Sequence, residues 1–345
     1  MTRRTIPVLV GLFAWLATAG CEPKLAPTIR PTSGDAYRIG IVIVQKLYLQ
    51  FRDAERTETV NINIDGDWKF TNVAKGHSAD LVFTLSSFSM RRASPEGVVE
   101  YAVRTPPGDS PTLPAGYTRA FTQCPLSLRL NGAGGLELFE GAQPLLTALR
   151  AEPDLADRTD RGELDRELEK ILSDRALADT LGLMFGILPP KKAKVGVEWD
   201  ATREMFFDVV PVAVKIRLNL RSILSGQARV EMKTEYAGES MGGFGPSNLR
   251  FGGDGIRGQG GGAAMISLES GLATRVDTNA EFRGEVSVYG NPHLDPNDYY
   301  PFRMERSVSF HAVPVAAPVE KPKKRSESRR SGKGPDFSAP VPNED

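Results

Sequence analysis

The chain has 345 residues, of which 40% are hydrophobic, and its 43 basic and 43 acidic side chains give a formal net charge of +0. Without a net charge, no global field attracts a polyanion, so the composition argues against nucleic acid as a partner. The hydrophobic content is sufficient for a buried core, and the length allows one large β domain or two modest ones.

The N-terminus has the pattern of an export signal that ends at a cysteine. Arg3 and Arg4 form a positive segment, and the apolar run 6–17 is too short to span a bilayer but has the length of a signal-peptide core. Small residues precede Cys21, as in the lipobox of bacterial lipoproteins, although Thr18 stands where leucine is commonest. We therefore predict lipidation at Cys21; the alternative is an ordinary signal peptide that is cleaved elsewhere.

Composition and periodicity divide the chain into four segments. We predict a lipoprotein signal peptide at 1–20, a flexible tether at 21–36, a β-rich domain at 37–313 and a disordered basic tail rich in Pro and Ser at 314–345. Within the domain, the predicted halves span about 37–140 and 193–313, on either side of a helical segment at 142–188.

Alternating apolar residues predict the strands. Ile39, Ile41 and Ile43 share one face of a long strand, because residues at a period of two lie on the same side. Asp65 and Gly66, between two alternating runs, predict a hairpin turn. A short similarity between "VAKGHSADLVFTL" and "ILSGQARVEMKT" suggests two related parts. The predicted fold is mainly β (α+β), with antiparallel curved or barrel-like sheets in two related halves and an inserted helical hairpin.

The helical segment contains two apolar stripes at helical spacing, which begin at Leu164 and Leu177. Asp174 lies where it could cap the second helix, and Pro189 would end it. We expect both stripes to pack on the sheet of the same chain, and binding of a partner is the alternative.

Two further stretches are informative, "LSLRLNGAGGLELFEG" and "GILPPKKAKVGVEWD". The second contains a Leu-Pro pair followed by a glycine and a tryptophan, at Leu188, Pro189, Gly196 and Trp199. With the lipobox and the helical pair, these stretches resemble a family of uncharacterised secreted bacterial lipoproteins with a domain of unknown function. The resemblance covers roughly residues 37–312. It implies export and a β-rich fold, and it supplies no activity, cofactor or catalytic residue.

No motif assembles a catalytic centre. "GESMG" places Ser240 in a G-x-S-x-G pattern, but glycines follow where the nucleophile elbow of a hydrolase needs a helix. "GDGIRG" matches a dinucleotide pattern, again without the helix behind it. We interpret residues 242–262 as a mobile glycine-rich loop. Cys124 shares the phase of the leucines after it and is predicted to be a core thiol.

A cation site is the remaining chemical hypothesis. His293, Asp295 and Asp298 gather in one segment, but its Asn, Asp and Pro residues are also ordinary turn formers. We predict no catalytic residue, no cofactor and no metal ligand.

Two classes of function remain. The favoured prediction is a non-catalytic, lipid-anchored lipoprotein of the bacterial cell envelope, at the outer membrane and facing the periplasm, that binds an apolar ligand or a protein partner. Its membrane contact is the N-terminal lipid, and the basic tail, which includes Lys323, Lys324 and Arg325, would add contact with an anionic envelope surface. The alternative is an envelope hydrolase with an unrecognised site.

Overall fold

The computed structural model describes residues 23–315 apart from 52–53, 75–77, 109–113, 157, 183, 208–209, 240–248, 290–294 and 296. The predicted signal peptide, Cys21 and residues 316–345 of the predicted tail lie outside these described residues. No helix within the described ranges is long and apolar enough to cross a membrane.

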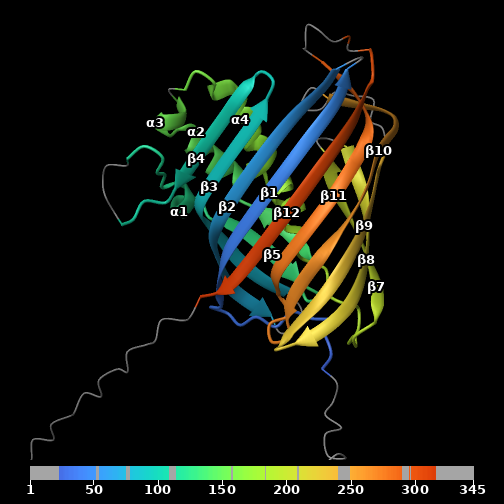
Figure 1. Ribbon diagram of the computed structural model, residues 1–345. Coiled ribbons are helices and arrows are strands. Elements are labelled where there is room, and N and C mark those ends of the chain that lie inside the picture. Colours follow the sequence, from blue (N-terminus) through green and yellow to red (C-terminus); the bar gives the residue numbers. More distant parts are fainter. Residues whose placement is uncertain are drawn as a thin grey trace, which may run out of the picture. The chain divides into compact units, whose positions relative to one another are not determined.

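Within the described residues, twelve antiparallel strands form a single sheet, which confirms the prediction of a mainly β fold (Figure 1). The strand order is β6-β5-β3-β2-β1-β12-β11-β10-β9-β8-β7, and β4 pairs with residues 87–94 of β3. Because β1 pairs with β12, the strands before and after the helices belong to one continuous sheet rather than to separate sheets. The strands are β1 (Ala36–Phe51), β2 (Ala54–Ala74), β3 (Ser78–Ser94), β4 (Gly97–Arg104), β5 (Leu126–Asn131), β6 (Leu136–Glu140), β7 (Glu198–Phe207), β8 (Val210–Leu224), β9 (Gln227–Gly238), β10 (Leu249–Ser267), β11 (Ala273–Val288) and β12 (Tyr300–Pro314).

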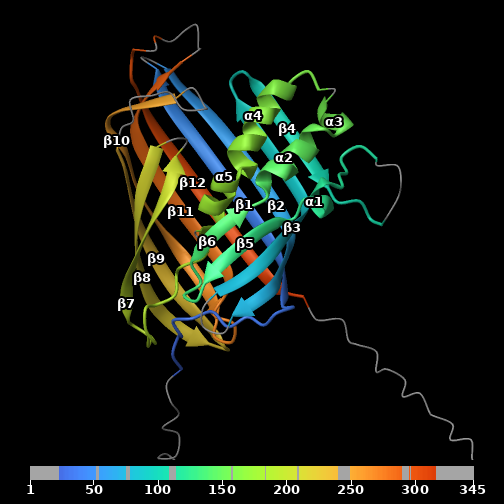
Figure 2. The same ribbon diagram turned by 180° about the vertical axis from the view of Figure 1, so that it is seen from behind.

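The described chain has α1 (Ala120–Gln123), α2 (Ala142–Arg150), α3 (Pro153–Ala156), α4 (Arg161–Leu172) and α5 (Asp174–Gly182). In Figure 2, α1–α4 gather beside β3 and β4, and α5 lies between β6 and β7. Helix α5 contacts β6 and β7, the strands at the two ends of the strand order. It therefore packs beside both places where hydrogen bonding between strands ends along this order.

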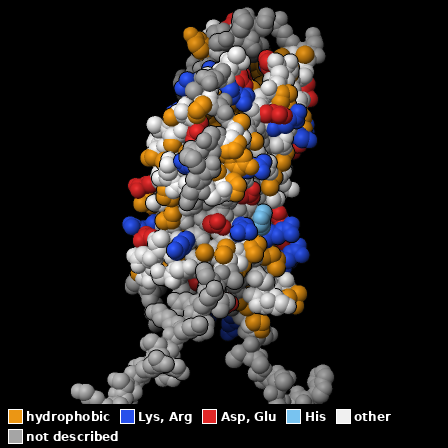
Figure 3. Space-filling model, turned by 90° about the vertical axis from the view of Figure 1, so that its left-hand side faces the viewer, with side chains coloured by type: hydrophobic (Ala, Val, Ile, Leu, Met, Phe, Trp, Pro, Cys, Tyr) orange, Lys and Arg blue, Asp and Glu red, His pale blue; other side chains and the backbone are white. Residues whose placement is uncertain are grey.

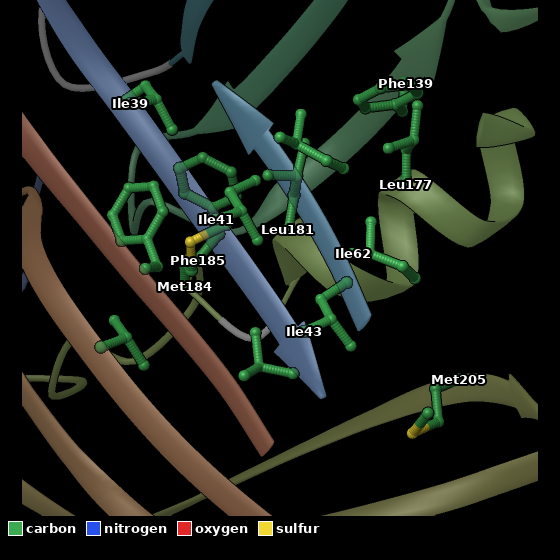
Figure 4. Close-up of a cluster of buried hydrophobic side chains, with 14 of the residues drawn as sticks. Ile39, Ile41, Ile43, Ile62, Phe139, Leu177, Leu181, Met184, Phe185 and Met205 are labelled. Atoms are coloured by element: carbon green, nitrogen blue, oxygen red, sulfur yellow. The ribbon is translucent and has the colours of Figure 1, made fainter. Parts of the chain in front are cut away.

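The inner face of the sheet holds the hydrophobic core. Along β1 the buried residues alternate with exposed ones, so that Ile39, Ile41 and Ile43 point inward (Figure 4). They face Leu181 of α5 and the residues that follow this helix. Trp68 of β2 stacks on the ring of Phe185 at a centroid distance of 5.2 Å and on that of Phe310 at 5.4 Å. Aromatic stacking adds to the free energy gained from burying these rings.

The outer face of the strands is polar and charged. Cross-strand ion pairs such as Arg91–Glu100 and Arg221–Glu231 lie on it, and both pairs are largely exposed. Figure 3 shows one side of the molecule, where acidic and basic side chains are interspersed with hydrophobic ones. Alternation between an apolar inner face and a charged outer face is typical of strands that have a core on one side and water on the other.

The predicted hairpin turn at Asp65-Gly66 is wrong. Strand β2 continues through both residues, and its pairing with β3 shifts register between Asp65 and Gly66. A Cβ on Gly66 would collide with the ring of Phe83 and lie 3.1 Å from the Cα of Leu85. The glycine therefore permits a bulge and a close backbone approach in the middle of a long strand.

The glycine-rich stretch is also not a loop where it is described. Strand β10 includes Gly252–Gly262 and pairs with β9 and β11, and residues 240–248 lie outside the described residues. Gly258 faces Tyr236 on one neighbouring strand and Phe282 on the other, and these two rings lie 4.7 Å apart. Burial of the aromatic rings beside Gly258 supplies the packing that a glycine strand lacks by itself.

The predicted helical segment lies where the helices are found, but the predicted number of helices and the predicted cap residue are wrong. Four helices, α2–α5, occupy residues 142–182 in place of the predicted pair. Ser173 caps α5, because its Oγ accepts a hydrogen bond from the Ala176 amide at 3.3 Å. Asp174 instead accepts from the amide of Ala142 at 2.9 Å and so holds the start of α2.

The described part of the predicted flexible tether, residues 23–35, is docked on the domain. Leu25 exchanges two backbone hydrogen bonds with Ala193, at 2.9 and 3.0 Å, and its side chain is 1% exposed. Arg30 donates to the carbonyl of Leu268 at 2.6 Å. The Pro and Thr content suggested a free segment, but Leu25 and Ile29 provide apolar surface that packs against the core.

We predict that Leu25→Ala lowers the free energy of unfolding by about 2–5 kcal/mol, because it leaves a cavity in a packed core. The control is Leu224→Ala, at a leucine that is 72% exposed, where we expect a change within about 0.5 kcal/mol. Urea denaturation of both variants measures the difference. Equal, small effects would mean that the N-terminal segment is a free tether after all.

Candidate functional site

The residues singled out by sequence do not come together as a site. Cys21, Ser240 and His293 lie outside the described residues. Asp295 accepts hydrogen bonds from Asn297 at 2.8 and 3.0 Å, as expected for a turn. Within the described ranges, no three His, Cys, Asp or Glu side chains are grouped so that they could hold a metal ion. Cys124 is a free, half-buried thiol that packs against the core.

A cluster of charged side chains lies on the inner face of the sheet. Arg203 comes from β7 and Arg306 from β12, and each occupies an inward position between apolar residues of its strand that are buried or partly buried. Helix α5 supplies Asp179 and Thr180. The Nη2 of Arg306 donates to the Thr180 hydroxyl at 3.2 Å, and the Phe206 amide donates to Oδ2 of Asp179 at 2.9 Å. We call Arg203, Arg306, Asp179 and Thr180 the inner-face cluster.

Several polar atoms at this place lack a partner. The Nε and Nη2 of Arg203, the Nε of Arg306 and the hydroxyl of Thr234 on β9 have no solvent contact and no hydrogen-bond partner in the described part of the chain. Leaving a buried donor unsatisfied costs roughly 1–3 kcal/mol, and more when the donor is charged. Both arginines nevertheless keep part of their surface accessible. The cluster thus offers donors for which the described chain provides no acceptor.

The charges of the cluster do not balance. Burial lowers the pKa of Arg203 and of Arg306, opposed by the nearby Tyr236 and Asp179; a guanidinium still remains charged in a protein. Burial raises the pKa of Asp179, against the hydrogen bond from the Phe206 amide and the attraction of Arg203, Arg306 and Arg175. Three cations thus act on a single carboxylate. A buried charge without compensation is costly, so this place favours an additional anion.

In a second buried network on the same face, the cation is matched by carboxylates of the chain. Arg92 of β3 donates to Glu163 of α4 at 2.5 Å and to Glu58 of β2 at 3.0 Å, and Glu167 lies 3.6 Å away. Burial opposes the charge of Arg92, but its hydrogen bond and electrostatic attraction to Glu58 lead the effects that raise its pKa. This network joins α4 to the sheet, and its arginine has its counter-charges within the chain.

In two grooves on the outer face, as around Arg92, charged side chains are paired with opposite charges of the same chain. A groove of about 500 Å³ beside β4 is lined by Asn61, Tyr117 and the ion pair of Arg91 with Glu100. A second groove, of about 680 Å³, crosses the outer face of β8 and β9 and includes the paired residues Arg221 and Glu231. Neither groove combines buried donors with a missing acceptor, so the inner-face cluster is the better candidate site.

The sequence carries a signal for this site that periodicity analysis missed. Along β12 the inward positions are Phe302, Met304, Arg306, Val308 and Phe310, so that one arginine replaces an apolar residue. Arg203 interrupts the inward positions of β7 in the same way. A charged residue in the buried phase of a strand is expensive and therefore informative.

The fold and the cluster define a mainly β protein with a polar site on the inner face of a single curved sheet. The chain belongs to a family of unknown function (DUF6263), whose sequence model matches residues 76–273. No curated protein matches the chain.

Solved structures that include an outer membrane channel and an outer membrane protein align with the chain at low similarity. OccK5 (OpdH) of Pseudomonas aeruginosa is 8% identical, with a TM-score of 0.21, over 81% of this chain and 98% of that one. An outer membrane channel of Pseudomonas putida F1 is 7% identical, with a TM-score of 0.25, over 83% and 97%. OprD of Pseudomonas aeruginosa is 8% identical, with a TM-score of 0.19, over 84% and 97%. Scores this low carry no argument about this chain.

The raised pKa of Asp179 predicts a pH dependence of stability. In the window between the ordinary pKa and the raised one, the folded state binds more protons than the unfolded state, so the free energy of unfolding falls as pH rises. Asp179→Asn removes this dependence. We therefore expect the stability of the natural protein, relative to Asp179→Asn, to increase when urea denaturation is measured at falling pH from 7 to 4.

Asp80→Asn is the control of opposite sign. The hydrogen bond from Arg129 lowers the pKa of Asp80, so its contribution is present above the ordinary pKa and is lost as pH falls. Parallel pH profiles for the natural protein and Asp179→Asn would contradict the assignment.

Proposed function

We propose that this chain is a non-catalytic, lipid-anchored lipoprotein of the bacterial cell envelope that binds an apolar ligand on the inner face of its curved sheet. The observation that carries the proposal is the inner-face cluster, where buried donors lack acceptors while the surrounding side chains are apolar. A mostly apolar lining with a few convergent polar groups is typical of a site for a small molecule.

The anchoring part of the proposal draws support from the two ends of the described chain. The amide of Val315 donates to the carbonyl of Ala36 at 2.8 Å, so β12 ends where β1 begins. A lipid on Cys21 would hold this end of the sheet nearest the membrane. The charged outer face suits a domain that stands in water, because a lipid-facing surface would be apolar. We place the protein at the outer membrane, facing the periplasm.

A contact between the basic tail and an anionic envelope surface belongs to the same proposal. The cluster of Lys323, Lys324 and Arg325 follows β12 in the sequence. Its attraction to anionic lipid headgroups would weaken with salt, since the Debye length falls to about 3 Å near 1 M.

We predict that Cys21 carries a diacylglyceryl group and is the first residue of the mature protein. Mass spectrometry of protein extracted from membranes measures the adduct, and Cys21→Ser should abolish it and leave the protein misprocessed or released. Ser33→Cys in the Cys21→Ser background is the control, because a cysteine outside the lipobox should restore no lipid. An unmodified mature chain that starts at another residue would overturn the anchor.

We predict that the protein retains an apolar molecule when it is extracted from its own membrane in a mild non-ionic detergent. Native mass spectrometry should show an added mass on the protein, and extraction with organic solvent should remove it. The outer-face control Arg217→Gln should carry the same added mass. A hydrolase would instead turn over ester substrates and lose that activity in Ser240→Ala. Repeated absence of any added mass would contradict the proposed function.

A further inference from the structure

The inner-face cluster specifies the charge of the ligand as well as its place. Arg203, Arg306 and Arg175 act on Asp179, and among the described groups it is the single carboxylate that opposes the effect of burial on Arg203 and Arg306. Arg175 is occupied elsewhere, since its guanidinium lies 3.2 Å from the centroid of the Phe206 ring. Arg203 and Arg306 therefore share one counter-charge, whereas Arg92 in the second network has its own carboxylates.

Small residues occupy the inward positions of the strands that lead from one arginine toward the other. In the register of the sheet, the inward positions that lead from Arg306 toward β7 are Ala280, Gly260 and Thr234. Gly260 has no side chain, and a Cβ there would lie 2.8 Å from the Thr234 hydroxyl and closer still to the carbonyl of Asn279. Long arginine side chains from β7 and β12 can extend over such a floor. The unpartnered Thr234 hydroxyl lies on it.

The walls around this floor are apolar. Buried inward side chains of the neighbouring positions are Met205, Val212, Val214, Phe282 and Met304. A ligand with many hydroxyl groups would leave those groups without partners here, which costs affinity. A ligand with one anionic group and an apolar body satisfies both the guanidinium donors and the walls.

We propose that Arg203 and Arg306 bind the carboxylate or phosphate group of an amphipathic ligand, with Thr234 as an additional donor and the apolar body of the ligand against Phe282 and Met304. This inference rests on the proposed function and names the ligand class. Asp179 acts as the internal counter-ion while the site is empty, and the anion of the ligand competes with it for the two guanidinium groups. Guanidinium is well suited to this role because it forms paired hydrogen bonds with carboxylate and phosphate.

Isothermal titration of the full lipidated protein in non-ionic detergent tests the proposal with four probes: octanoate, octyl phosphate, octanol and inorganic phosphate. We expect octanoate or octyl phosphate to bind at least about tenfold more tightly than octanol or inorganic phosphate, since a hydrogen bond to a charged group contributes enough for such a ratio. The tighter of the two anionic probes identifies the head group.

Substitutions assign the binding to the cluster. Arg203→Gln and Arg306→Gln should each weaken the anionic probe about tenfold or more, and Arg203→Lys should weaken it less because the charge remains. Arg217→Gln, at an arginine whose side chain is 66% exposed on the outer face, is the matched control and should leave the affinity unchanged. Asp179→Asn should tighten binding severalfold, since it removes the competing carboxylate. A purely structural role of Asp179 does not predict that gain.

The outcomes separate this inference from the proposed function. If octanol binds as tightly as octanoate and the arginine variants bind both equally, the anionic head group is refuted while the apolar ligand remains. If none of the four probes binds, both are refuted. If the glutamine variants fail to fold, Arg203→Lys and Asp179→Asn decide: unchanged affinity in both overturns the inference.

Discussion

The two open edges of the sheet are the constraint on which the rest of the structure depends. A curved sheet that ends at β6 and β7 exposes unpaired backbone groups and one apolar face, and helix α5 contacts both edges. Its apolar residues Leu177 and Leu181 are buried against the inner face. The same helix carries Asp179 and Thr180 into the interior. Closure of the sheet and assembly of the inner-face cluster therefore depend on one short helix.

The two buried networks show how this fold treats charge. Arg92 is enclosed by carboxylates from β2 and α4, which fixes the helix to the sheet. Arg203 and Arg306 share Asp179, and their remaining donors point at no acceptor of the described chain. Buried charge is tolerated where it is paired, and the two arginines of the inner-face cluster have fewer carboxylates around them than Arg92 has. The proposed binding role rests on this contrast rather than on the shape of the sheet.

Much of the fold follows from the sequence because alternation is a local property. Ile39, Ile41 and Ile43 lie on the inner face as predicted. The prediction errors arise where contacts between residues far apart in the sequence determine the local structure. Gly66 lies in a bulge against Phe83, and the glycine-rich stretch forms a strand beside the rings of Tyr236 and Phe282. The site was missed although Arg306 interrupts an apolar phase, since a single strand does not show that Arg203 faces the same interior. Cys21 remains a prediction from sequence.

A crystal structure of the protein isolated from its native membrane, without exchange into a charged detergent, tests the central claim most directly. We predict electron density for an anionic head group within hydrogen-bond distance of Arg203 and Arg306, with apolar density beside Met304 and Phe282. A well-ordered interior in which both guanidinium groups bond only to protein atoms and water would contradict the account.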